Sequence, residues 1–93
     1  MVALNWEIAI TQSNKWKESG NKIVFTNGCF DLIHRGHIDL LSQAKNKGDK
    51  LIVGINTDRS VQQLKGDDRP IQTYDDRVII INAINCVDMV VGF

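Results

Sequence analysis

Residues 27–37 of this 93-residue chain read Asn27-Gly28-Cys29-Phe30-Asp31-Leu32-Ile33-His34-Arg35-Gly36-His37. A run of large apolar residues just before them predicts a short buried strand over residues 22–27. Gly28 then allows the backbone to turn sharply and to come close to a ligand. After the turn, apolar residues at helical spacing (Ile38, Leu41, Ala44) predict a helix from about Arg35 to Gly48. We therefore expect the segment to join a strand to a helix.

Strands and helices are predicted to alternate along the rest of the chain. A helix over residues 4–19 comes first, with apolar positions at Leu4, Ile8, Ile10 and Trp16. Beyond the central segment, the pattern predicts a strand over 50–56, a short helix over 59–64, a helix over 74–85 and a strand over 89–93. Continuous apolar strands separated by amphipathic helices are typical of a parallel sheet with helices on its faces. The sequence therefore predicts an α/β fold of three layers with right-handed crossovers.

Length and composition limit the organisation and the partners of the chain. Residues 1–93 form at most one small domain, with residues 1–20 as a leading helix and residues 22–93 as the α/β core. Eleven basic residues balance eleven acidic ones, so no net field attracts nucleic acid or a membrane surface. The sequence has neither a spanning apolar stretch nor a secretion signal, and we expect a cytoplasmic protein. Cys29 and Cys86 are too far apart in sequence to suggest a zinc site or a disulfide framework.

The residues after the first predicted strand suit an anion. Ligands of open α/β sheets bind beyond the carboxyl ends of the strands, where turn amides and a helix N-terminus attract phosphate. The only histidines of the chain, His34 and His37, are spaced so that both can face the same anion. Gly36 between them removes a side chain that would crowd a triphosphate. Packing or helix capping is the alternative for the two histidines, and a zinc site is disfavoured because a third ligand is lacking.

Residues 22–93 resemble the H-x-G-H family of nucleotidyltransferases. Four segments are most similar to its heptose 1-phosphate adenylyltransferase branch: 26–31, 48–53, 56–58 and 65–70. The resemblance implies a Rossmann-like nucleotidyltransferase fold of which the chain carries the N-terminal half, with about three strands. It also implies transfer of AMP from ATP to heptose 1-phosphate, which forms ADP-heptose for lipopolysaccharide assembly and releases pyrophosphate.

The same resemblance assigns roles to individual residues. It implies that His34, His37 and Lys65 act on the phosphates as catalytic residues. The residues expected to contact the nucleotide are Asn27, Gly28, Cys29, Phe30 and Gly36. For Lys65 the alternative is an ordinary solvated lysine of a loop.

Four further residues are expected to contact the acceptor substrate: Asp31, Asp58, Arg69 and Arg77. Asp31 could instead organise the turn by accepting backbone hydrogen bonds. Arg69 could instead balance Asp67 and Asp68, which we favour, and Arg77 could be a surface arginine of its helix. Trp6 and Trp16 are interpreted as packing residues rather than as a base-stacking site.

The implied cofactor is Mg²⁺, which coordinates phosphate oxygens and water, and the implied partners are ATP and a sugar phosphate. A homodimer and fusion to a sugar kinase domain are both compatible with the resemblance. One alternative activity is a cytidylyltransferase that uses glycerol 3-phosphate. Another is an inactive phosphate-binding fragment, because the sequence does not match the C-terminal segment with which the family binds the nucleotide.

Overall fold

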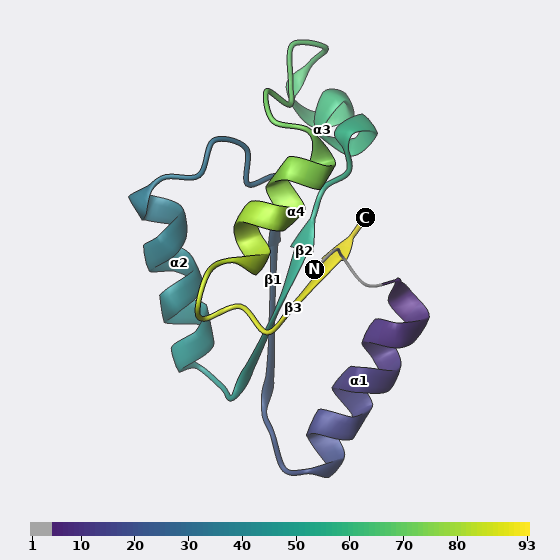
Figure 1. The fold of residues 1–93 in the computed structure, drawn as a ribbon, viewed down its shortest axis with the longest axis vertical. Helices are drawn as coiled ribbons and strands as arrows, with labels where there is room; N and C mark the ends of the chain where they lie inside the picture. Colours follow the sequence, from purple (N-terminus) through teal and green to yellow (C-terminus); the bar gives the residue numbers. More distant parts are fainter. Residues whose placement is uncertain (1–4) are drawn as a thin grey trace.

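The structure is a computed structural model that describes residues 5–93 (Figure 1). Seven elements follow one another: α1 (Trp6–Glu18), β1 (Ile23–Gly28), α2 (Arg35–Asn46), β2 (Lys50–Ile55), α3 (Asp58–Lys65), α4 (Tyr74–Asn82) and β3 (Met89–Gly92). All seven were predicted from the sequence, and their ends differ from the predicted ones by at most three residues. Leu4, at the start of the first predicted helix, lies outside the described residues.

The three strands form one parallel sheet in the order β1-β2-β3. In β1 and β2, Ile23 pairs with Lys50 and Gly28 with Ile55, so both strands end at the same level. In β2 and β3, Ile52 pairs with Met89 and Ile55 with Gly92. The carboxyl ends of all three strands therefore lie along one edge of the sheet, which confirms the predicted α/β class with a parallel sheet.

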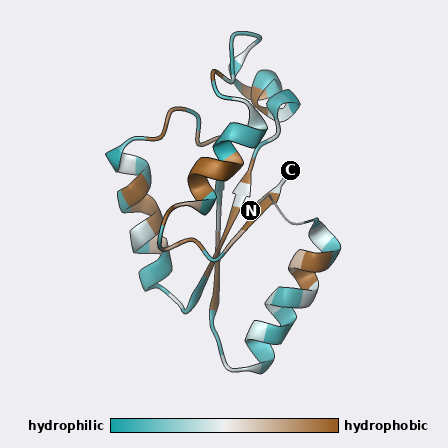
Figure 2. Cartoon of the chain, in the orientation of Figure 1, coloured by the Kyte–Doolittle hydropathy of each residue, from teal (hydrophilic) through white to brown (hydrophobic). Residues whose placement is uncertain are grey.

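Helices cover both faces of the sheet, because alternate residues of each strand point to opposite faces. On one face, Leu51, Val53 and Ile55 of β2 pack in a cluster with Leu41 of α2 and Ile81 of α4. Figure 1 shows α2 and α4 together on this side and α1 on the other, and Figure 2 shows hydrophobic residues concentrated on the strands and on α4. The arrangement is the predicted one of three layers.

The packing of α1 differs from the prediction. Ala9 is the buried residue of α1, and together with Trp16 it meets the sheet through Ile52, Met89 and Val91. Ile8 and Ile10, which the periodicity placed on the buried face, are more than half exposed. The reason is that the face centred on Ala9 and Trp16 turns toward the sheet, which leaves the two isoleucines on the flanks. Trp16 packs there as predicted, whereas Trp6 is 48% exposed and donates its indole N–H to the carbonyl of Gly92.

No helix among residues 5–93 is both long enough and apolar enough to cross a lipid bilayer.

One carboxylate fastens α2 to the amino ends of the strands. Asp88, just before β3, accepts hydrogen bonds from the Leu51 N–H and from the ammonium of Lys45 on α2. The two charged side chains are about one-quarter exposed, so water screens them only in part. By contrast, Arg35 and Asp39 form an ion pair on the outer surface of α2 at 3.8 Å, with both side chains largely in solvent.

We expect Asp88→Ala to destabilise the protein by about 1–3 kcal/mol, because it leaves the Leu51 N–H without its acceptor and Lys45 without its partner. Asp39→Ala, which removes the exposed ion pair, should change the stability by less than about 1 kcal/mol. Urea unfolding of the two variants beside the parent measures the difference. Equal losses would contradict the role assigned to Asp88.

Candidate anion-binding site

A cavity of about 180 Å³ opens at the carboxyl end of β1. It is lined by Asn27, Gly28, Cys29, Phe30, Asp31, His37, Leu40 and Lys65. Except for Leu40, every one of these residues was predicted to belong to the site. The cavity thus brings together the turn after β1, the first turns of α2 and the last residue of α3.

The loop between β1 and α2 has a strained backbone at the cavity. Phe30 and Leu32 have φ angles of 51° and 58°, in the left-handed region that costs a non-glycine residue about 1–2 kcal/mol. Phe30 is nonetheless well anchored, because its side chain is buried in the core. No described residue accepts a hydrogen bond from the Phe30 N–H. A free amide beside a helix N-terminus is the kind of group that binds phosphate.

His34 and His37 cap the N-terminus of α2 reciprocally. His34 Nδ1 accepts a hydrogen bond from the Gly36 N–H at 3.0 Å, and His37 Nδ1 accepts one from the His34 N–H at 3.1 Å. A ring nitrogen that accepts cannot also carry a proton, so each neutral ring carries its proton on Nε2. The predicted alternative of helix capping is therefore real, yet it leaves each Nε2–H as a donor. The two ring centroids are 4.2 Å apart.

The environment of His37 favours its neutral form. Burial lowers the pKa of the His37 imidazole below its ordinary value, and the positive charges of His34 and Lys65 lower it further. The ring also lies 5.7 Å from that of Phe30, centroid to centroid. At neutral pH, His37 therefore presents to the cavity an uncharged ring that donates from Nε2.

The packing of the helix start requires a glycine at position 36, and the predicted role of Gly36 in leaving room for a triphosphate stays a prediction. A Cβ at this position would lie 2.8 Å from Cε1 and 3.0 Å from Nδ1 of His34. The missing side chain therefore makes room for the His34 ring to cap α2, and this contact requires no triphosphate. Gly28 is close-packed in a similar way, since a Cβ there would lie 3.1 Å from the Phe30 ring.

Asp31 organises the loops around the site. Its carboxylate is 1% exposed and accepts hydrogen bonds from Arg69 Nε and from the N–H groups of Ile71 and Gln72. Burial by itself would raise the pKa of Asp31, but these hydrogen bonds and the charge of Arg69 outweigh it and lower that pKa. Of the two roles considered for Asp31, the contacts support organisation of the turn rather than binding of sugar hydroxyls.

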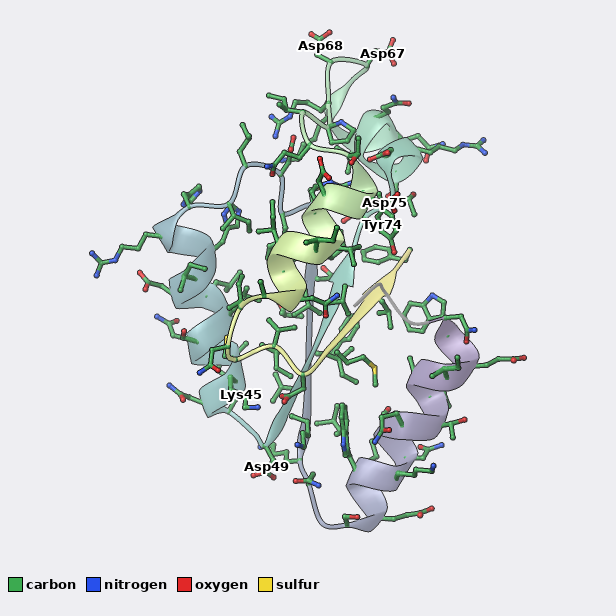
Figure 3. The ribbon with its side chains drawn as sticks, in the orientation of Figure 1. Lys45, Asp49, Asp67, Asp68, Tyr74 and Asp75 are labelled. Atoms are coloured by element: carbon green, nitrogen blue, oxygen red, sulfur yellow. The ribbon has the colours of Figure 1, made fainter. Side chains whose placement is uncertain are left out.

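The favoured role of Arg69 was wrong. We predicted that this guanidinium balances Asp67 and Asp68, whereas it pairs with Asp31 at 2.8 Å. Figure 3 shows the two aspartates at the tip of the loop, pointing away from the rest of the molecule. The carboxylate of Asp31 attracts Arg69 more strongly because it is buried and weakly screened.

The structure excludes one of the two roles considered for Arg77. It is fully buried, so it is no surface arginine, and protein groups accept hydrogen bonds from four of its five N–H donors. Its Nε donates to the carbonyl of Gln72, one terminal nitrogen donates to the carbonyls of Cys29 and Asn56, and the other to the carboxylate of Asp58. Contact with the acceptor is not favoured by this burial. The arginine instead connects the ends of β1 and β2 with the start of α3.

Lys65 and Asp58 keep the positions expected of them. Lys65 is an exposed residue at the end of α3 and contributes to the cavity wall. Asp58 begins α3 beyond β2, where one carboxylate oxygen meets Arg77 and the side chain remains 46% exposed. Both side chains can therefore be reached by a ligand at this edge of the sheet.

Two larger hollows flank α1, and neither is lined by the turn after β1 or by the start of α2. One of 320 Å³ is lined by Glu7, Ile8, Thr11, Gln12 and Lys15, and one of 210 Å³ is lined mainly by apolar side chains of α1 and the sheet. Within residues 5–93, no three His, Cys, Asp or Glu side chains are grouped so that they could hold a metal ion. The cavity at the end of β1 is therefore the candidate site.

Sequence reasoning missed two contributors to the site. Leu40, one turn beyond His37, forms an apolar part of the cavity wall and is 47% exposed. Gln72 accepts a hydrogen bond from the Leu32 N–H and so supports the strained loop from across the site. The spacing of Leu40 from His37 could have signalled the first, whereas no local pattern identifies the second.

Comparison with known proteins identifies relatives of the chain. The curated relatives include proteins named Bifunctional protein HldE from Wolinella succinogenes (51% identity over 87% of this chain), Azorhizobium caulinodans (53% over 84%) and Methylobacillus flagellatus (46% over 96%). The aligned part is 16–18% of the length of these relatives, so the chain spans about one-sixth of each.

A solved structure and a family model point in the same direction. The lipopolysaccharide core biosynthesis protein of Thermoplasma volcanium superposes with a TM-score of 0.72 at 29% identity, over 80% of this chain and 59% of that one. The model of the family described as cytidylyltransferase-like matches residues 25–93, which include the whole candidate site. The chain belongs to the cytidylyltransferase-like family of nucleotidyltransferases.

Proposed function

We propose that this chain binds ATP and transfers its AMP to a sugar 1-phosphate, with heptose 1-phosphate as the acceptor. The observation that carries the proposal is the convergence of donors on one cavity at the carboxyl end of β1. The free Phe30 N–H, the His37 imidazole and the Lys65 ammonium come from three different elements to the same 180 Å³ space. Such a set suits a chain of phosphates better than a single carboxylate.

The reaction needs alignment and charge stabilisation rather than a strong base. A phosphate oxygen of the sugar, already anionic at neutral pH, forms a new bond to the α-phosphorus of ATP. The bond from that phosphorus to the oxygen bridging it to the β-phosphorus breaks, and pyrophosphate leaves with the electron pair. The task of the protein is to hold the reacting atoms in line and to neutralise the leaving charge.

Each residue of the site has a step that suits its geometry. His37 donates from Nε2 to a phosphate oxygen without first losing or gaining a proton. His34, which caps the same helix start through the Gly36 N–H, is the second proposed donor to the phosphates. Lys65 brings a charge on a flexible stem to the departing pyrophosphate. The free oxygen of Asp58 is available to a hydroxyl of the acceptor. Mg²⁺ enters with the triphosphate as part of the substrate, held by phosphate oxygens and water.

The choice of heptose 1-phosphate rests on the relatives. Proteins at about 50% identity carry the name HldE, and the similar solved structure is a lipopolysaccharide core biosynthesis protein. The word bifunctional in the names of much longer relatives supports a place for this unit in a larger protein with a second activity, such as a sugar kinase. Because ATP is a cytoplasmic metabolite, the cytoplasm is the proposed location.

The test is pyrophosphate release by the chain with Mg²⁺-ATP, in the presence and absence of heptose 1-phosphate. We expect release that depends on the acceptor. It should fall by about 100-fold in Lys65→Met, because the positive charge that stabilises the leaving pyrophosphate is lost. A parallel reaction with CTP and glycerol 3-phosphate tests the alternative cytidylyl activity. Release only in that reaction, or no release from a folded chain with either pair, would refute the proposal.

The packing of Gly36 gives a second prediction. Gly36→Ala should displace the His34 ring, because the new Cβ would lie 2.8 Å from Cε1 of that ring. We expect turnover to fall by about 10- to 100-fold, while urea unfolding changes by no more than about 1 kcal/mol, since alanine favours the helix. Gln43→Ala, at an exposed position of the same helix, is the control and should leave turnover unchanged. Normal turnover in Gly36→Ala would show that the position of the ring is unimportant.

The protonation of His37 can be tested directly. The unfolded side chain takes up a proton near pH 6.5 and the folded one only at lower pH. The contribution of His37 to stability is therefore present above that pH and is lost as the pH falls toward the folded pKa. Nitrogen NMR of the rings should show the proton on Nε2 at pH 7, with His37 titrating below 6.5.

Lys65→Met should move the His37 pKa upward only in part, because burial is the larger cause of its lowering. A proton on Nδ1 of His37, or titration above 6.5, would contradict the capping geometry.

A further inference from the structure

Arg77 is the most completely engaged ionisable group of the described structure, and it lies behind the cavity rather than in its wall. Its guanidinium reaches Cys29 O and Asn56 O at 2.7 Å each, Gln72 O at 3.0 Å and Asp58 Oδ1 at 2.9 Å. These partners stand 48, 21, 5 and 19 residues away in sequence. A structural ion pair alone would not require three carbonyls from three separate segments.

We propose that Arg77 is a positioning residue, which fixes the Cys29–Phe30 peptide so that the Phe30 N–H is presented to the anion. The inference rests on the function proposed above and extends it to a residue that touches no substrate. In a trans peptide the C=O and the following N–H point in opposite directions. Because Arg77 draws the Cys29 carbonyl into the protein, the Phe30 N–H is turned the other way, and no described residue accepts a hydrogen bond from it.

The backbone at Phe30 explains why such a fixing group is needed. With φ at 51°, Phe30 adopts a conformation that the free chain would abandon, because a left-handed turn is unfavourable for a side chain of this size. Burial of the Phe30 ring holds one side of the turn, and the hydrogen bond from Arg77 to Cys29 holds the other. Removal of either should let the peptide rotate and withdraw the amide.

The same guanidinium also sets the position of Asp58. One oxygen of that carboxylate is bound by Arg77, and the rest of the side chain is half exposed at the start of α3. The group proposed to meet the acceptor and the amide proposed to meet the nucleotide are thus aligned by one buried cation. The planar guanidinium, with its fixed set of N–H donors, can hold both groups at once, whereas the single ammonium of a lysine cannot reach all four partners.

The experiment uses inorganic pyrophosphate as the probe and follows backbone amide resonances of the chain. In the parent we expect the Phe30 amide to shift on titration together with the His37 resonances. Arg77→Lys keeps a positive charge in the buried position but loses the guanidinium and its simultaneous hydrogen bonds to four partners. It should weaken pyrophosphate binding by about 10-fold or more and reduce the response of the Phe30 amide.

Lys45→Met is the matched control, since it removes a partly buried cation from its carboxylate at the other end of the sheet. It should lower stability and leave pyrophosphate binding unchanged. Parental binding by folded Arg77→Lys would overturn the proposal.

A titration of the parent in which His37 responds and the Phe30 amide does not would overturn it as well, even if no Arg77 variant folds. If the parent does not bind pyrophosphate at all, the nucleotide site of the proposed function is refuted before the role of Arg77 is tested. That outcome is recognised by the absence of any response at His37.

Discussion

Three backbone carbonyls at the carboxyl edge of the sheet point inward and are satisfied by one buried guanidinium. Burying a charge is costly unless it is paired and hydrogen-bonded, and removing one partner of a buried pair typically costs about 3–5 kcal/mol. Arg77 meets the condition through four contacts, and only one of them is to a charged group. Because those contacts come from the loops after β1 and β2, from the start of α3 and from the segment just before α4, the edge that carries the candidate site depends on this residue.

A second buried charge, the carboxylate of Asp31, organises the loops at the same edge of the sheet. Asp31 gathers two backbone N–H groups and Arg69, and these draw the segment 69–72 against the loop that follows β1. Gln72 adds a hydrogen bond to the Leu32 N–H within the same loop. Asp31 and the strained Leu32 are therefore held by partners that lie about 40 residues later in the chain.

Sequence patterns were sufficient for the elements and for the location of the site. Apolar runs in β1, β2 and β3 specify a parallel sheet, and ligand sites of such sheets lie at the carboxyl edge, where Phe30, His37 and Lys65 are found. The partners of Arg77, Arg69 and Asp31 could not be predicted, because each is chosen by contacts between segments far apart in the chain. Helical periodicity likewise could not decide which face of α1 meets the sheet, since its isoleucines flank the small Ala9 that fits against the strands.

The reciprocal capping at the start of α2 has a consequence for how this segment can change over evolutionary time. His34, Gly36 and His37 form one interlocked unit, in which each ring or missing side chain is required by another member. A replacement at one of these positions disturbs a ring that another member of the unit holds in place, and with it the proposed donors. Arg35, inside the same four residues, has a side chain that is 92% exposed and is free of this constraint. Related chains should therefore vary more at position 35 than at positions 34, 36 and 37, because only the side chain at position 35 is outside the interlocked contacts.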